Sequence, residues 1–384
     1  MDEFSGTVRK ALTDRGVSIR AAARQLHYDP AYLNRVVNGR QAASPDLIEA
    51  LNEFLGLSLN VPEAPHDDET DAWELTRRVQ SSDVGPATLE RLEMAFDALA
   101  VAYPRTSPEV LLQQVRKHAG YVAKLLDGRK TLSEHRRLLV LGGWLSLLGA
   151  TVHIDMNQNS AATARLQTAV TLAREAGHAD IQAWCLETEA WRVLTAGEFE
   201  RAVELSRAAQ ATAPAGSSAL IQATAQEGRA QARLGRSRET HAAIERVQQM
   251  SAALGDPGAP EHHYQYDPAK SVSYTATTLA WLGDSAAEAY AREVVARLGP
   301  GDDLSRWPRR VASAHIDLAL ALLAADRHDE ACESAQKALL SGRVVPSNHW
   351  RALEVVRAVE SRGLPEAAGL REAYQDMRRP KALP

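Results

Sequence analysis

The segment VSIRAAARQLHYDPAYLNRVVNG (residues 17–39) predicts how the first part of the chain folds. Ser18 can cap one helix, and Asp29 followed by Pro30 can start the next, because an acid suits the N-cap and proline suits the first helical position. Gly39 is expected to end that second helix, since glycine readily adopts the left-handed conformation that follows many helices. The segment therefore predicts two short helices joined by a tight turn.

Similar start and stop signals surround this segment. A preceding helix is expected to end near Gly16. Ser44 with Pro45 repeats the start signal for a later helix, which is expected to end before Gly56. Residues 1–57 therefore predict a compact block of four helices.

Residues 17–39 resemble, without a gap, the helix-turn-helix of the phage-repressor-like, xenobiotic-response-element family of transcription regulators. In such a unit one helix packs closely over the other, which requires a small residue at the crossing and apolar residues on the inward face. The residues that match the family pattern are Ala23, Leu26, Leu33, Val36 and Gly39. The resemblance implies an all-α domain that binds double-stranded DNA.

Three positions depart from the family pattern. Ile19 replaces a glutamine whose amide usually contacts a phosphate, and Asp29 replaces a Ser or Thr that often contacts the DNA. His27 replaces the usual glycine of the turn, and histidine is among the residues that tolerate a positive φ. These departures predict that DNA recognition depends on the middle of the second helix more than on its first residues.

The resemblance also implies which side chains approach the DNA. Arg35 can donate two hydrogen bonds to guanine O6 and N7, Ala31 can meet a thymine methyl group, and Asp29 can accept from a cytosine amine. Phosphate contacts, which set the register, are expected from Arg20, Tyr32, Asn34, Asn38 and Arg40. The complete set of DNA-binding candidates is Ser18, Arg20, Tyr28, Asp29, Pro30, Ala31, Tyr32, Asn34, Arg35, Asn38 and Arg40. For each of them, a solvated side chain without a DNA contact is the alternative.

Local charge favours DNA binding, although the total charge does not. The formal net charge of the chain is −5, whereas residues 9–40 contain seven Lys or Arg and two acids. Such a local basic excess can bind phosphates, with an affinity that falls steeply as salt rises. The alternative is that this basic face is only solvated, and that the four-helix block is a helical cap that does not bind DNA.

The rest of the chain predicts a linker and a long helical domain. Residues 58–74 contain two prolines and six acids without Lys or Arg, which is typical of a solvated linker. Residues 75–384 show helical spacing of apolar residues, as from Leu89 to Leu99, and no alternating β pattern of useful length. With 45% hydrophobic but only 5% aromatic residues, the chain predicts an all-α fold.

Turn-like residues recur in this second part at intervals of 37 to 48 residues, near Asn157, Gly197, Gly235, Gly283, Asp326 and Gly363. Each separates two helical stretches, which predicts an α-solenoid of stacked helical hairpins. The hairpins resemble tetratricopeptide repeats, since small residues occupy that family's positions for close helix approach. These are Ala202, Ala209, Gly228, Ala331, Ala335 and Ala338, with Pro214 ending one unit. The resemblance implies a superhelix whose inner face suits an extended peptide.

Five residues of the predicted repeats are candidates for ligand contacts. Trp184 and Trp191 are seven residues apart, so they share a helix face, and they flank Glu187. Gln222 and Gln226 lie one turn apart and could hydrogen-bond a peptide backbone. The alternative is that the two tryptophans belong to the apolar core.

The sequence does not predict a metal site, a cofactor or an enzyme. In residues 255–270, Glu261, His262, His263 and Asp267 are possible metal ligands, but adjacent histidines without a helix to orient them are poorly spaced for that role. An exposed or partner-contacting loop is expected there instead. The chain has no P-loop, paired Cys-x-x-Cys, His-Glu-x-x-His or nucleophile-elbow pattern.

The remaining signals predict a soluble, cytoplasmic and nucleoid-associated protein. Cys185 and Cys332 are expected to be reduced and buried. The N-terminus lacks the apolar core of a signal peptide. The longest apolar run, residues 138–150, has 13 residues and is too short to span a bilayer.

These observations together predict a bacterial transcription regulator. Residues 1–57 would bind DNA, residues 58–74 would be the linker, and residues 75–384 would form the repeat domain. The repeat domain is expected to form a homodimer and to sense a peptide, a protein or a small molecule. The competing interpretation is a protein-interaction scaffold whose N-terminal block does not bind DNA.

Overall fold

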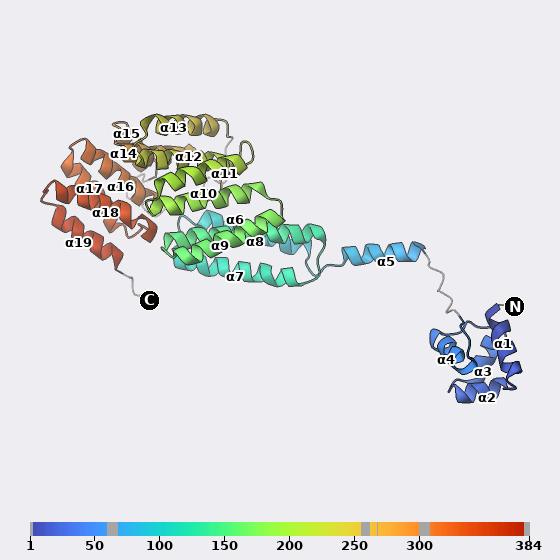
Figure 1. The fold of residues 1–384 in the computed structure, drawn as a ribbon. Coiled ribbons are helices and arrows are strands. Elements are labelled where there is room, and N and C mark those ends of the chain that lie inside the picture. The colour runs from blue at the N-terminus through green and yellow to red at the C-terminus, as the bar shows by residue number, and fades with distance from the viewer. Residues whose placement is uncertain (1–2, 60–67, 255–261, 267, 299–307, 380–384) are drawn as a thin grey trace. The chain divides into compact units, whose positions relative to one another are not determined.

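The structure is a computed structural model that describes residues 3–59, 68–254, 262–266, 268–298 and 308–379. These described residues form helices and connecting turns without a strand, which confirms the expected all-α fold. The chain divides into two compact units, Met1–Val79 and Gln80–Pro384 (Figure 1).

The first unit begins with four short helices: α1 (Glu3–Asp14), α2 (Ile19–Gln25), α3 (Pro30–Val37) and α4 (Pro45–Leu55). The expected caps are confirmed. Side-chain oxygens of Ser18, Asp29 and Ser44 each accept a hydrogen bond from a backbone amide in the first turn of the following helix. His27 has a φ of 57°, as expected for the residue in the turn. Buried apolar side chains from all four helices form one core.

A fifth helix, α5 (Asp68–Gln80), begins inside the segment that was expected to be a linker. Residues 60–67 of that segment lie outside the described residues. The side chains of Trp73, Leu75 and Val79 are 71%, 65% and 63% exposed, so these large apolar residues of α5 pack against little of the described chain.

The second unit starts with α6 (Pro86–Ala102) and α7 (Pro108–Asp127) and continues as a series of helical hairpins. In the described residues the hairpins are α8 (Leu132–Asp155) with α9 (Asn159–Glu175), α10 (Ala179–Thr195) with α11 (Phe199–Thr212), α12 (Ser218–Arg233) with α13 (Ser237–Ala252), α14 (Pro268–Leu282) with α15 (Ala287–Leu298), α16 (Pro308–Ala324) with α17 (His328–Leu340), and α18 (His349–Ser361) with α19 (Ala367–Arg378). A short 3-10 helix, η1 (Pro346–Asn348), precedes α18.

The predicted turns and the predicted stacking are both confirmed. Each of the six expected turn residues lies between the two helices of a hairpin, and their φ angles are all positive, between 56° and 87°. From α8 to α18, the first helix of each hairpin packs on its own partner and on the first helix of the next hairpin. The second unit is therefore an α-solenoid.

Small residues allow this close stacking, as the sequence predicted. The five expected alanines, at 202, 209, 331, 335 and 338, are at most 3% exposed. A Cβ atom added to Gly228 of α12 would lie 3.1 Å from the Cβ of Ala243 of α13. The glycine is therefore required by the close approach of two helices rather than by a turn.

The helix α8 is the longest and one of the most buried helices among those that the structure describes. Among the described helices it is the one long and apolar enough to cross a membrane, with a mean hydropathy of 1.5, but 83% of that stretch is buried inside the protein. The 13-residue apolar run of the sequence is thus part of a 24-residue helix. The sequence had suggested that this segment is too short to span a membrane, but the length of the helix does not exclude a span. The burial of α8 inside the protein indicates instead that it is a core helix.

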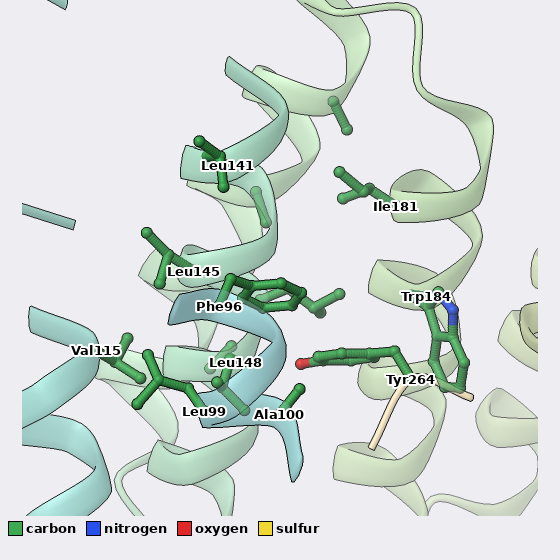
Figure 2. Close-up of a cluster of buried hydrophobic side chains, with 14 of the residues drawn as sticks. Phe96, Leu99, Ala100, Val115, Leu141, Leu145, Leu148, Ile181, Trp184 and Tyr264 are labelled. Carbon is green, nitrogen blue, oxygen red and sulfur yellow. The ribbon is translucent and has the colours of Figure 1, made fainter. Parts of the chain in front are cut away.

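Residues 255–270 were expected to form an exposed or partner-contacting loop. Within residues 262–266, which the structure describes, His262, Tyr264 and Tyr266 are buried and the other two residues are half-buried, so the prediction of an exposed loop was wrong there. Tyr264 is 4% exposed, and its ring lies between Phe96 of α6 and Trp184 of α10, with ring centroids 6.1 and 5.2 Å away (Figure 2). The polar residues of this connection suggested an exposed loop. Its aromatic rings instead fill space in the core, and this packing decides its position.

Candidate functional site

The helix α3 has the amphipathic arrangement expected of a recognition helix. Leu33, Val36 and Val37 are at most 1% exposed and pack into the core of the first unit. The residues expected on the outward face, Ala31, Asn34, Arg35 and Asn38, are exposed, and Tyr32 is half-buried. The fold therefore presents one polar face of α3 to solvent.

Arg35 lies on this exposed face, in the last turn of α3. Its Nε donates a hydrogen bond to Oε1 of Gln41 at 2.8 Å. Among the described residues, none accepts a hydrogen bond from its two terminal amino groups. The interaction with Gln41 restricts the side chain, and the two terminal groups keep the donors that a guanine edge requires.

Asp29 stabilises the start of α3. Its Oδ1 accepts a hydrogen bond from the backbone amide of Tyr32 at 2.8 Å. The carboxylate thus offsets unpaired amides and the positive end of the helix dipole. Pro30 follows at the first helical position, where a missing N–H has no cost.

Asn34 and Asn38, two of the predicted phosphate contacts, interact with each other. Asn38 Nδ2 donates to the backbone oxygen of Asn34 at 2.7 Å and to its side-chain oxygen at 2.6 Å, and Asn38 Oδ1 accepts from Arg9 at 2.6 Å. Arg9 also donates to the backbone oxygen of Val37 at 3.1 Å. These contacts close the C-terminal end of α3, and the sequence indicated no such role for Arg9 beyond its charge.

The other candidates occupy varied positions in the first unit. The Tyr32 hydroxyl accepts a hydrogen bond from the backbone amide of Ser44 at 3.0 Å, so it positions the start of α4. Tyr28 is half-buried, with its ring centroid 6.2 Å from that of Tyr32. The candidates Ser18, Arg20, Pro30 and Arg40 are exposed.

The five candidate ligand residues, Trp184, Glu187, Trp191, Gln222 and Gln226, line a single cavity of about 230 Å³ in the second unit. The first helix of every hairpin, from α8 to α18, contributes to its lining. Neighbouring repeats therefore curl around this cavity. Trp184 is also part of the apolar core, so the core interpretation and the cavity interpretation both describe this residue.

Several cavity residues that the sequence did not reveal carry charge. Arg351 of α18 forms a buried ion pair with Asp317 of α16, and Asp317 also accepts a hydrogen bond from Thr277 at 2.6 Å. Arg229 of α12 and Arg309 of α16 line the same cavity. Arg309 pairs with Asp155 of the first hairpin, and Arg351 pairs with the neighbouring hairpin, so no local motif in the sequence marks these pairs.

Gln222 is engaged within the protein. Its Nε2 donates to Glu187 Oε1 at 2.9 Å and to the Tyr274 hydroxyl at 2.8 Å. Burial raises the pKa of Tyr274, so this hydroxyl stays protonated. The polar wall that these residues form is therefore organised before any ligand enters.

The described residues hold no group of three or more His, Cys, Asp or Glu side chains placed to bind a metal ion. Glu261 and Asp267, two of the four residues weighed for that role, lie outside the described residues. The two cysteines are free and buried, as expected, and burial raises the pKa of Cys185 to about 12.

Comparison with known proteins bears on the first unit. Residues 3–64 match a family model described as a helix-turn-helix domain. A search of curated proteins found no match to the chain. The matched segment contains α1 to α4 with their caps and the exposed face of α3, so the N-terminal unit carries a helix-turn-helix domain.

Proposed function

We propose that this protein is a sequence-specific, DNA-binding transcription regulator. The observation that carries the proposal is the exposed, capped helix α3, with Arg35 on the outward face of its last turn, inside a segment that matches a helix-turn-helix family model. In this role α3 enters the major groove and Arg35 reads a guanine, while the flanking basic residues bind phosphates.

The second unit acts as the sensor in this proposal. Its repeats, which resemble tetratricopeptide repeats, pair two copies of the chain and place two helix-turn-helix domains on half-sites separated by about 34 Å or a multiple of it. A peptide, protein or small-molecule signal binds in the cavity lined by Trp184, Trp191 and Gln226. Its different affinity for two shapes of the array then changes the spacing of the DNA-binding domains. The protein is cytoplasmic and nucleoid-associated in this role, and it is not an enzyme.

The first test uses recovery of genomic DNA fragments by the full chain and by a chain that lacks residues 1–57. If the protein is a transcription regulator, recovery of DNA fragments is expected to depend on residues 1–57. Equal recovery would favour the competing interpretation, a scaffold whose N-terminal block does not bind DNA. Sequencing of the recovered fragments gives the operator and its symmetry.

The second test addresses Arg35 directly. In a mobility assay at fixed salt, Arg35→Ala is expected to weaken binding to the recovered operator by about 1–3 kcal/mol and to relax one base position. Arg238→Ala, on the exposed surface of the second unit, removes the same charge and is the matched control. Undiminished binding by the Arg35 variant would refute the assigned role.

The dimer is a separate part of the proposal with its own measurement. Sedimentation of the full chain at micromolar concentration, and of the chain from residue 81 onward, should give a dimer in both cases. A monomer at that concentration would exclude the half-site mechanism in this form.

A further inference from the structure

Arg229 of α12 is a buried guanidinium that has no ion-pair partner in the part of the chain that the structure describes. It is 8% exposed and lines the cavity of the second unit. Its NH1 donates to Gln226 Oε1 at 3.0 Å, and its guanidinium lies 4.9 Å from the Trp281 ring centroid and 5.2 Å from that of Tyr274. Among the described residues, no carboxylate lies within ion-pair distance of it.

Nearby arginines show what this position lacks. Arg309 pairs with Asp155 at 2.9 Å, Arg233 pairs with Glu354 at 2.8 Å, and Arg351 pairs with Asp317. Burial lowers the pKa of Arg229, because the protein does not replace the hydration of its charge. Removing a cation from water without a partner is costly, so a bound anion would offset this cost.

The unpaired polar atoms of the cavity are all of one kind. Four buried side-chain nitrogens of its lining have no hydrogen-bond partner in the described structure: Nε1 of Trp184, Nε2 of Gln226, Nε of Arg229 and Nε of Arg351. Each of these atoms is a donor, since the Gln226 amide is oriented by its oxygen accepting from Arg229. No acceptor atom of the lining is left unpaired in this way. The cavity is therefore complementary to a ligand that is rich in acceptors.

The surroundings favour a carboxylate over a phosphate. Asp317 and Glu187 act electrostatically on Arg229, and Arg351 acts on it with the opposite sign. The negative charges of the two carboxylates disfavour a doubly charged anion more than a singly charged one. A carboxylate carries one charge, is planar, and matches the fork of a guanidinium. The aromatic side chains of Trp184, Trp191 and Tyr274 in the same lining suit an apolar body attached to that group.

We propose that Arg229 and Gln226 form an anion subsite that binds a carboxylate of the cavity's ligand. The carboxylate is either that of a small organic acid or the C-terminal carboxylate of a short peptide. This inference rests on the proposed sensing role for its biological meaning, but the subsite itself can be tested without DNA.

The test measures binding to the full chain by calorimetry. The probes are phenylacetate and the dipeptide N-acetyl-Phe-Gly, each compared with its uncharged amide, and inorganic phosphate. At least one carboxylate is expected to bind, with an affinity about tenfold or more above that of its amide, because a charged hydrogen bond is lost in the amide. Binding of the dipeptide alone identifies a peptide source, and binding of phenylacetate alone identifies a small acid. The inference is overturned if no carboxylate binds, if acid and amide bind equally, or if phosphate alone binds.

A pair of variants separates a ligand-binding role from a structural one. Arg229→Met removes an unpaired buried charge, so the ligand-free chain is expected to melt at the same temperature or higher, while carboxylate binding falls about tenfold or more. Arg351→Met leaves Asp317 without its cation and is expected to lower the melting temperature. A lower melting temperature for Arg229→Met, or unchanged carboxylate binding, would overturn the inference.

The sensing role and the subsite fail in different ways. If carboxylates bind to the wild type and not to Arg229→Met, the subsite stands even when they leave operator binding unchanged. That result would contradict the proposed sensing mechanism and would still support the anion subsite.

Discussion

Arg309 donates a hydrogen bond to Asp155 at 2.9 Å, although 154 residues separate them in the chain. The same carboxylate accepts from the Tyr103 hydroxyl at 2.8 Å and from the Ser347 hydroxyl at 3.2 Å. It therefore ties the end of α8 to the segment after α6, to the start of α16 and to η1. This buried acid lines the cavity and links the first hairpin of the solenoid to later ones.

Loss of the cation in this network is expected to destabilise the second unit. Arg309→Met leaves Asp155, which is 2% exposed, without its charged partner and should lower the free energy of unfolding by about 3–5 kcal/mol. Arg129→Met is the matched control, because Arg129 and Asp83 form an exposed pair at 3.5 Å that is worth about 0–1 kcal/mol. Urea unfolding of both variants measures the difference, and equal losses would argue against a structural role for the buried pair.

The close approach at Gly228 makes a second prediction. Gly228→Ala places a Cβ 3.1 Å from that of Ala243 and should cost about 1–3 kcal/mol of stability through forced displacement of α13. Gly120 of α7 has no neighbour within 4 Å of an added Cβ, so Gly120→Ala should instead stabilise by about 0.5–1 kcal/mol through helix propensity. Opposite shifts in melting temperature are the expected result. A stabilising effect at both positions would show that the helices can separate freely at Gly228.

Two buried histidines, His153 and His315, and the half-buried His349 predict a pH dependence of stability. Burial lowers the pKa of His153, His315 and His349. The unfolded chain then takes up protons before the folded chain does, so stability is fully present above the ordinary histidine pKa of about 6.5 and is lost as pH falls toward the folded-state pKa values. The loss should reach at most about 1.4 kcal/mol per pH unit for each histidine.

The measurement is the free energy of unfolding of the second unit, obtained from its urea transition at several pH values between 7.5 and 5.5. Replacing the three histidines by glutamine should flatten the dependence in this range, whatever it does to the stability at pH 7.5. An unchanged slope in the triple variant would assign the dependence to other groups.

Substitutions of Asp29, the N-cap residue of α3, can distinguish its effect on stability from its effect on DNA binding. Asp29→Ser keeps an N-cap acceptor and removes a negative charge, so stability should hold while operator binding strengthens. Asp29→Ala removes the charge and the cap together and should lower the stability of the first unit by about 1 kcal/mol. Both variants are tested by thermal unfolding and by operator binding at two salt concentrations. Weaker binding by Asp29→Ser would point to a direct contact of Asp29 with a base.

Local signals in the sequence were sufficient for much of this fold. The caps at Ser18, Asp29 and Ser44, the positive φ of His27 and the six hairpin turns all follow from the preferences of a few adjacent residues. The apolar face of α3 follows from the helical period. Such signals act within about one or two turns, so they are readable without the rest of the chain.

Signals of that range did not reveal every element. The proline-rich and acidic residues 58–74 indicated a linker but not the helix α5, which begins at Asp68 inside that segment. The polar residues near His262 indicated an exposed loop, yet Tyr264 and Tyr266 are buried. They pack against helices that are far from them in the sequence. In the second case long-range packing outweighed local composition.

The sequence by itself determined the helical class, the helix-turn-helix segment, the repeat of hairpins and the candidate residues on α10 and α12. Only the tertiary structure decided that those candidates line one cavity. It also decided that Arg229 has no carboxylate partner among the described residues, whereas Arg309 pairs with the first hairpin and Arg351 pairs with the neighbouring one. The reason is that helix caps and periodicity act between neighbours in the chain, whereas charge pairing and burial depend on which repeats the curvature of the solenoid brings together.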